Sequence, residues 1–233
     1  MNIISSSGMP AHDAGLFITQ SMFEHINDRV LLLLSGGSSL EILKYIDTDV
    51  LGPHITIMMA DERFTDDALG NNFSQLSHTD FYRDAKVAGV KFISSKVRKD
   101  ETHSAFTKRL RDKLLKYLKG SSKPFIIGTF GIGHDCHTAS IFPKQTKKEF
   151  DKIYATSASY ISINEPNNEF HKRTTVTPEF IKNEINEVII YAAGKQESLF
   201  ALQYAKTVNQ CPALLLTEHG NFTLFTDAEI AEL

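Results

Sequence analysis

Four short apolar runs constrain the fold of this chain more than any other feature of its sequence. They are residues 30–34, 55–59, 125–127 and 188–191, and polar side chains hardly alternate within them. A strand with one face in water alternates apolar and polar residues, whereas a strand covered on both faces reads as a continuous apolar run. The runs therefore predict a sheet that is buried on both sides, as parallel sheets are.

Helical patterns separate these runs. We expect helices at residues 11–28, 73–82 and 100–120, and helix starts after residues 39, 177 and 195. The pattern is strongest in residues 100–120, where Asp100 or Thr102 is a candidate N-cap and Gly120 follows the last turn. Strands that alternate with helices predict an α/β protein with a doubly wound, mostly parallel, Rossmann-like sheet and helices on both faces.

Weaker patterns complete the expected order of elements. Strands are predicted at residues 87–93, 154–163, 213–216 and 222–225, and a loop or short helix at residues 144–152. We find no repeat, no low-complexity tract and no linker, so residues 1–233 are expected to form a single domain.

Composition excludes several classes of protein. A formal net charge of −3 argues against non-specific binding of nucleic acid, which needs a basic surface. Residues 1–15 lack the pattern of a signal peptide, and residues 30–34, the longest apolar run, are too short to span a bilayer. With only two cysteines we expect no disulfide framework and a reducing cytoplasm. No obligate protein partner is inferred.

A glycine-serine segment follows the first apolar run directly. Ser35, Gly36, Gly37 and Ser38 lie between this predicted strand and the helix expected from Leu40. This order points backbone N–H groups and a helix N-terminus at one place, which attracts anions and above all phosphate. The alternative is a tight turn without a ligand, because short glycine motifs are weak evidence.

Charged residues follow the second run. Asp61, Glu62 and Arg63 come one residue after it, and charges there are costly unless they face solvent or a site. The two interpretations are a surface loop with an ion pair and a functional site.

A cluster of polar residues follows the third run, after Gly131 and Gly133. We expect His137 to be the working group, with Asp135 beside it, because a histidine near a carboxylate suits a general base. A metal site is the weaker alternative, since adjacent side chains diverge and no second His/Cys cluster exists. Cys136 is more simply a small packed thiol than a nucleophile.

These polar groups are expected to meet. In a doubly wound sheet, ligands bind beyond the carboxyl ends of the strands, near a switch point. Lys195, which follows a predicted strand, and Arg173 add fixed positive charge. Backbone donors and cations suit a phosphate monoester, and a histidine base suits the activation of water.

These motifs resemble the 6-phosphogluconolactonase family, within a larger group that includes glucosamine-6-phosphate deaminase. The similar segments are LSGGSSL at 34–40 (family SGGSTP), DER at 61–63 (DER), NN at 71–72 (Ser-Asn), GIGHDCHTASIFP at 131–143 (GxGxDGHTASLFP), RTTVT at 173–177 (RxTxT) and KQESL at 195–199 (the late lysine helix). They occur in the family's order and cover nearly the whole chain. Cys136 replaces the family's glycine, and a cysteine is strained there if the position needs a positive φ. Ser39-Leu40 replaces Thr-Pro, and Ala192 stands where a glycine commonly precedes the lysine.

The resemblance implies hydrolysis of 6-phospho-D-glucono-1,5-lactone to 6-phospho-D-gluconate, in the oxidative pentose phosphate pathway. It makes His137 the general base, Asp61 an orienting group and Arg63 a ligand of substrate or developing charge, with no metal or organic cofactor. Ser35, Gly36, Gly37, Ser38, Arg173 and Lys195 hold the 6-phosphate of the sugar-phosphate substrate. The alternatives are an enzyme like glucosamine-6-phosphate deaminase/isomerase, which typically has Asn-Glu-Pro soon after the histidine, and a non-catalytic sugar-phosphate sensor.

Overall fold

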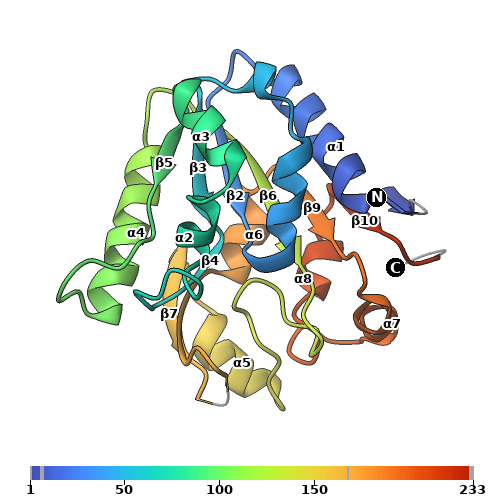
Figure 1. Ribbon diagram of the computed structural model, residues 1–233. Coiled ribbons are helices and arrows are strands. Elements are labelled where there is room, and N and C mark those ends of the chain that lie inside the picture. Colours follow the sequence, from blue (N-terminus) through green and yellow to red (C-terminus); the bar gives the residue numbers. More distant parts are fainter. Residues whose placement is uncertain (1, 6–7, 167, 231–233) are drawn as a thin grey trace.

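A seven-stranded sheet forms the centre of the molecule in the computed structural model, which describes residues 2–5, 8–166 and 168–230 (Figure 1). Its strands lie in the order β1-β10-β9-β6-β2-β3-β5, and every pairing between them is parallel. Their bounds are β1 Asn2–Ser5, β2 Val30–Leu34, β3 Ile55–Met59, β5 Lys91–Ile93, β6 Phe125–Gly131, β9 Glu187–Tyr191 and β10 Phe222–Thr226. The predicted doubly wound parallel sheet is confirmed.

Helices cover both faces of this sheet. They are α1 Pro10–Glu24, α2 Asn72–Leu76, α3 Asp80–Val87, α4 His103–Leu118, α5 Lys147–Tyr154, α6 Pro178–Glu184, α7 Gln196–Tyr204 and α8 Leu214–Thr217, with the 3-10 helices η1 Gly37–Tyr45 and η2 Thr48–Val50. In the part of the chain that the structure describes, no helix is both long enough and apolar enough to cross a membrane.

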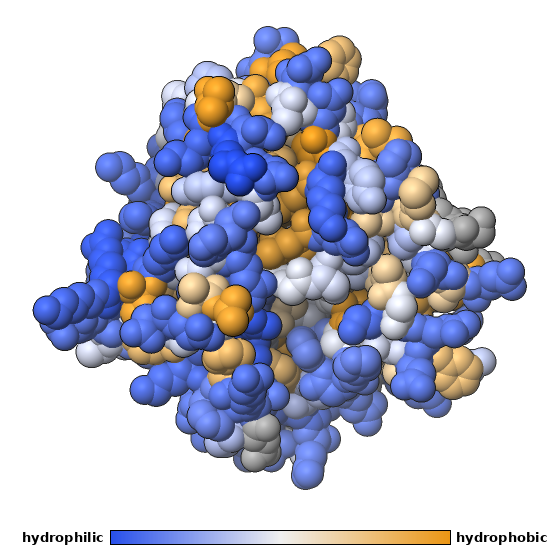
Figure 2. Space-filling view, in the orientation of Figure 1, coloured by the Kyte–Doolittle hydropathy of each residue, from blue (hydrophilic) through white to orange (hydrophobic). Residues whose placement is uncertain are grey.

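Two separate cores explain the continuous apolar runs. Leu31 and Leu33 of β2 belong to one core, together with residues of α4 and α6. Leu32 and Leu34 belong to the other, together with residues of α1, η1, α2 and α3. Because successive side chains of a strand point to opposite faces, β2 must be apolar at every position. The helices do not cover this second core completely. Figure 2 shows apolar groups in a hollow beside η1.

A second sheet lies beyond the carboxyl ends of the central strands. It is antiparallel, in the order β4-β8-β7, with bounds β4 Asp61–Arg63, β8 Lys172–Val176 and β7 Tyr160–Asn164. The sequence did not predict this sheet, because β4 is only a three-residue strand of charged residues. Its effect is to place Arg63 opposite Arg173.

The switch point of the central sheet lies at β2. From β2 the chain continues outward through β3 and β5, and then returns to add β6, β9 and β10 on the other side. The carboxyl ends of β2 and β6 therefore lie side by side, and Ser35 N donates to Thr129 O at 3.2 Å across them. Ligands of doubly wound sheets bind at such a position.

Several predicted elements differ from the structure. Residues 213–216 are not a strand but mostly the short helix α8, since a four-residue apolar run fits either state. Residues 154–163 become a strand only from Tyr160, and residues 73–82 divide into α2 and α3 because the Thr79 side chain caps a new helix. The helix expected from Leu40 is the 3-10 helix η1, which begins at Gly37.

The core prediction concerns Phe106 of α4, which is fully buried and packs against Phe64 at a ring-centroid distance of 5.4 Å. Phe106→Ala should lower the free energy of unfolding by about 3–5 kcal/mol, because it removes buried apolar contacts and leaves a cavity. Leu115→Ala on the same helix is the control; Leu115 is 39% exposed, so its loss should stay below about 1 kcal/mol. Urea denaturation of the three proteins measures both values, and equal losses would contradict the assignment of Phe106 to the core.

Candidate active site

A cleft of about 270 Å³ opens at the carboxyl ends of β2 and β6. It is lined by Ser35, Gly36, Gly37, Ser38, Ser39, Asp61, Arg63, Asn72, Gly131, Ile132, Gly133, His134, His137, Ala139, Arg173, Tyr191 and Lys195. These include every residue that the sequence predicts for the site except Asp135, which lies beside His137. The structure thus brings the dispersed motifs to one place.

The glycine-serine segment forms one wall of this cleft. Ser35 is held by its backbone N–H, which reaches both the carbonyl and the hydroxyl of Thr129. Gly36 is required by a close approach, since a Cβ atom there would lie 2.1 Å from Asn72 Oδ1. Gly37 has a φ of +64°, which favours glycine. The close approach of Asn72 therefore explains Gly36, and the local backbone explains Gly37.

Asp61 and Arg63 line another part of the cleft, from β4. Asp61 is buried, and its carboxylate accepts a hydrogen bond of 2.5 Å from Ser140 Oγ. Arg63 Nη1 donates to Gly70 O at 2.9 Å, and its guanidinium lies over the ring of Phe170. The surface-loop interpretation of this motif is wrong, because the segment is a strand of the second sheet.

Glu62 lies between Asp61 and Arg63 in β4, is fully buried, and links β4 to neighbouring segments through hydrogen bonds. Its Oε1 accepts from the backbone N–H groups of Arg63 and Asn72, at 2.8 and 2.7 Å. Its Oε2 accepts from Phe73 N at 3.0 Å and Ser95 Oγ at 2.6 Å. Burial raises the pKa of this carboxyl to about 7, against the lowering effect of the four hydrogen bonds. Sequence analysis did not single out Glu62, although its place one residue beyond the expected site residue Asp61 was a usable signal.

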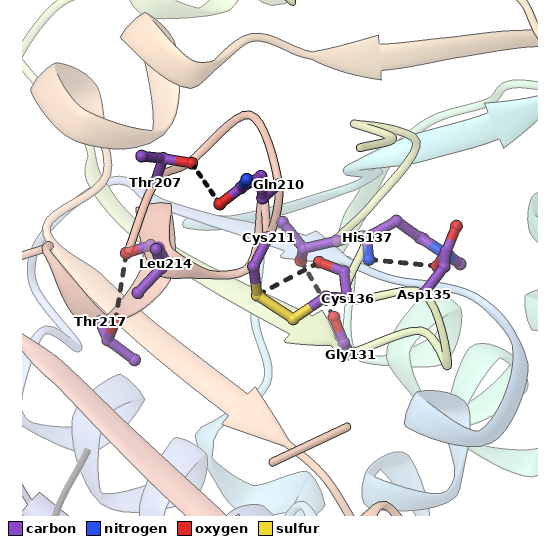
Figure 3. Close-up of a disulfide and its surroundings, with 10 residues drawn as sticks. Gly131, Asp135, Cys136, His137, Thr207, Gln210, Cys211, Leu214 and Thr217 are labelled. Atoms are coloured by element: carbon purple, nitrogen blue, oxygen red, sulfur yellow. Dashed lines mark hydrogen bonds and ion pairs between the residues drawn. A yellow bond between two sulfur atoms is a disulfide. The ribbon is translucent and has the colours of Figure 1, made fainter. Parts of the chain in front are cut away.

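The loop after β6 carries His137. Its imidazole Nδ1 is hydrogen-bonded to Asp135 Oδ1, as Figure 3 shows, and its backbone N–H donates to the same oxygen at 3.2 Å. Gly133 N donates to His137 O at 2.8 Å, and a Cβ atom on Gly133 would lie 2.1 Å from His137 Nδ1. The ring is thus closely confined by the loop that carries it.

The pair has a defined charge arrangement. Burial raises the pKa of Asp135, but the hydrogen bonds and charge of His137 outweigh it, and the net pKa lies below the ordinary value. In the neutral imidazole, Nδ1–H of His137 donates a hydrogen bond to the ionised Asp135, and Nε2 then carries the lone pair. That is the arrangement a general base needs.

Cys136, within this loop, is not a packed thiol. It forms a disulfide with Cys211, with a Cα–Cα distance of 4.9 Å (Figure 3). The prediction of no disulfide was wrong, because the two cysteines lie 75 residues apart and only the fold brings them together. Cys136 has a φ of +67°, so the strain expected for a cysteine at the family's glycine position is present.

Three cations of the cleft have no acidic partner. In the described ranges, no carboxylate oxygen lies within 4.0 Å of a side-chain nitrogen of Arg63, Arg173 or Lys195. Burial and the nearby charge of Arg63 lower the pKa of Arg173, while Asp61 raises it. Arginine nevertheless stays protonated in proteins, so the cleft holds an excess of positive charge that suits an anion.

Unpartnered polar atoms also gather here. In the described part of the chain, seven buried side-chain nitrogen or oxygen atoms lack a hydrogen-bond partner. Three of them, Ser35 Oγ, Arg63 Nε and Asn72 Oδ1, belong to residues of this cleft. Such atoms cost free energy unless they bind something, so their concentration marks a binding site.

Several residues of the cleft were missed by the sequence analysis: Ser39, Asn72, Gly131, Ile132, Gly133, His134, Ala139 and Tyr191. For Asn72 a signal existed, since it belongs to the Asn-Asn pair of the resemblance. Tyr191 gave none, because it reads as the last apolar residue of a strand. Within the ranges that the structure describes, no group of three or more His, Cys, Asp or Glu residues is placed to hold a metal ion.

Comparisons with known proteins show which family and which fold this chain resembles. The family model described as glucosamine-6-phosphate isomerases/6-phosphogluconolactonase matches residues 8–225. A probable 6-phosphogluconolactonase of Dictyostelium discoideum is 24% identical over 225 residues, which cover 90% of this chain and 89% of that protein.

Solved structures share the fold. A 6-phosphogluconolactonase of Shewanella baltica superposes with a TM-score of 0.77 at 22% identity, covering 97% of each chain. One from Plasmodium vivax has a TM-score of 0.74 at 16% identity and covers 98% of this chain and 90% of its own.

The titration of Glu62 generates a prediction about stability. Its folded pKa of about 7 lies above the ordinary value of 4.5, so only the folded protein keeps this proton between those pH values. The stabilisation is complete below about pH 4.5 and is lost as the pH rises through 7, by about 3 kcal/mol. Glu62→Gln cannot titrate at this position. The free energy of unfolding of the wild type, relative to that of this variant, should therefore fall by about 3 kcal/mol as the pH rises through 7.

Denaturation at about pH 4.5 and pH 7.5 measures this difference. Glu149→Gln is the control, because Glu149 is exposed in the first turn of α5. A wild-type advantage over Glu62→Gln that is the same at both pH values would contradict the assignment.

Proposed function

The chain belongs to the family of glucosamine-6-phosphate isomerases and 6-phosphogluconolactonases, and we propose that it hydrolyses 6-phospho-D-glucono-1,5-lactone to 6-phospho-D-gluconate. The observation that carries this proposal is one cleft that combines a histidine–aspartate pair with cations that have no acidic partner. The first suits activation of water, and the second suits a phosphate ester.

The phosphate of the substrate is assigned to the wall around the glycine-serine segment. The donors that the cleft offers to it are the backbone N–H groups of Gly36, Gly37 and Ser38, the Ser35 hydroxyl, and the cations of Arg173 and Lys195. Binding the phosphate away from the reacting carbonyl uses that binding to orient the lactone ring.

The lactone is assigned to the side of His137. Nε2 takes a proton from water, and the oxygen of that water attacks the carbonyl carbon. Arg63 stabilises the oxyanion that forms, and Asp61, held by Ser140, orients the groups around it. The bond to the ring oxygen then breaks, and the imidazolium returns its proton to that oxygen as it becomes a hydroxyl. Water is thus divided between the new acid and the new alcohol, and the acid ionises.

The rival functions have less support. Asn164-Glu165-Pro166 has the residue types of the deaminase motif but does not lie at the site, since Glu165 forms an ion pair with Lys144 and does not line the cleft. A sensor would bind the sugar phosphate without hydrolysing it. Release of ammonia from glucosamine 6-phosphate would favour the deaminase, and binding without turnover would favour the sensor.

His137→Ala should reduce kcat for the lactone by about 10²–10⁴-fold, because it removes the proposed base. Acid release from freshly prepared lactone, corrected for spontaneous hydrolysis, measures the rate. His25→Ala is a matched control. His25 also bonds an aspartate through Nδ1, with a similarly exposed side chain, but it follows α1 and stacks on Phe125 at the amino end of β6, whereas the cleft lies at the carboxyl end. A wild-type rate equal to the spontaneous rate would overturn the proposed function, and a fully active His137→Ala would overturn the role of His137 alone.

Arg173→Ala and Lys195→Ala should each raise KM by about tenfold and change kcat less, because a charge-assisted phosphate contact is lost. The same variants should weaken the rise in melting temperature that 6-phosphogluconate produces. Lys172→Ala is the control, since Lys172 is exposed and adjacent to Arg173 in β8. Unchanged KM and unchanged stabilisation in both variants would contradict the phosphate assignment.

A further inference from the structure

We propose that the Cys136–Cys211 disulfide is a positioning cross-link for His137, so that its reduction lowers the rate of the proposed hydrolysis. This inference rests on the proposed function for its kinetic consequence. Its structural basis is independent, because it concerns how one loop is fastened to the rest of the molecule.

The cross-link lies within the reactive loop itself. Cys136 stands between Asp135 and His137, the two members of the hydrogen-bonded pair. Cys211 comes from the segment before α8, and Ala213 N of the same segment donates to Cys136 O at 3.0 Å. Figure 3 shows the sulfur bridge and the His137–Asp135 pair on the same short stretch of chain. Any change in the backbone at Cys136 therefore acts directly on both side chains.

The other bonds of this stretch are local. Gly133 N donates to His137 O, Cys136 N donates to Gly133 O, and His137 N donates to Asp135 Oδ1. These bonds join residues within the loop and do not fix it to another element. Among the hydrogen bonds and covalent cross-links of residues 134–137 in the described chain, those to a distant segment are made by Cys136, through the disulfide and the hydrogen bond from Ala213 N.

The segment on the other side is firmly packed. Ala213 and Leu216 are fully buried, and Lys144 and Asn209 exchange two hydrogen bonds between their loops. Cys211 is thus an anchor and Cys136 is the residue that it holds.

The backbone conformation of Cys136 is the feature that the disulfide maintains. Its φ of +67° lies in the left-handed region, which is unfavourable for a residue with a Cβ atom. With the sulfur bridge intact, leaving that region would require Cys211 to move as well. Without it, relaxation of Cys136 rotates the peptide that joins it to His137 and disturbs the bonds to Gly133 and Asp135.

Reduction is ordinary thiol–disulfide exchange. A thiolate of a dithiol attacks one sulfur atom, the other leaves as a thiolate and takes a proton, and the second thiol of the reductant then closes its own disulfide. The two cysteines gain two electrons and two protons, which the dithiol supplies. A hollow of about 360 Å³ beside the bridge, lined by both cysteines, Ala201, Tyr204 and Gln210, gives the reductant an approach.

This chemistry fits the compartment that composition predicts. In a reducing cytoplasm, protein disulfides are mainly transient or redox-sensing and seldom purely structural. A disulfide inside the loop that carries His137 therefore makes the activity depend on the ratio of thiols to disulfides in the surroundings.

The test compares four forms at a temperature where circular dichroism shows all of them folded: oxidised wild type, wild type reduced with dithiothreitol, Cys211→Ala, and Cys136→Gly/Cys211→Ala. Reduced wild type and Cys211→Ala should lose kcat about tenfold while KM changes less than about twofold, because the phosphate ligands lie on other segments. The double variant should retain the kcat of the oxidised protein, and dithiothreitol should not change that kcat, because glycine adopts a positive φ without a cross-link. A purely structural bridge predicts no such rescue, and equal kcat in all four forms overturns the proposal.

Amide hydrogen exchange supplies a readout that does not depend on activity. The N–H groups of Gly133, Cys136 and His137 should exchange faster in reduced wild type and Cys211→Ala than in oxidised wild type. In the double variant, the amides at Gly133 and His137 should remain protected. If oxidised wild type does not hydrolyse the lactone, the proposed function fails, and exchange alone then decides the role of the bridge. Equal exchange in the oxidised and reduced wild type would overturn it.

Discussion

Burial of β2 on both faces is the constraint on which the rest of the structure depends. Its five apolar residues divide between two cores, and this requires helices above and below the sheet. Its two neighbours, β3 and β6, are parallel to it and belong to halves of the sheet that grow in opposite directions. The chain therefore has a switch point where the loops after β2 and β6 diverge, and the cleft lies there.

The second sheet turns this opening into a specific site. Pairing of β4 with β8 brings Arg63 and Arg173 to opposite positions, where two positive charges repel each other. The charge of Asp61 offsets part of that repulsion at Arg173. Glu62 accepts four hydrogen bonds and fixes the start of α2. The site thus combines Glu62, both of whose carboxylate oxygens accept hydrogen bonds, with cations that have no acidic partner and with three polar atoms that have no hydrogen-bond partner. That contrast separates groups that maintain the fold from groups that are available to a ligand.

The loop after β6 differs from these walls in how it is held. The walls are strands and helix ends with regular hydrogen bonds, whereas residues 134–137 rely on short-range bonds and on Cys136. Two residues of this loop region that are not glycine, Cys136 and Ala139, have positive φ angles. A conformation of this kind persists only where its surroundings enforce it, and such sites are often functional.

The sequence by itself determined the buried strands of the central sheet and most of its helices, because continuous apolar runs and capping residues such as Thr102, Thr177 and Pro178 act locally. It did not indicate the edge strand β1, and it indicated nine of the seventeen residues that line the cleft. Loops that follow parallel strands lie at one edge of the sheet, so eight of the ten residues proposed for the site could be expected to meet, with Asp135 joining through His137. The tenth, Arg173, comes from the antiparallel strand β8. Only the tertiary structure decided the antiparallel sheet, the buried role of Glu62 and the disulfide. Each of these joins segments far apart in the chain, and charged strands, buried carboxylates and two distant cysteines carry no local pattern that reveals their partners.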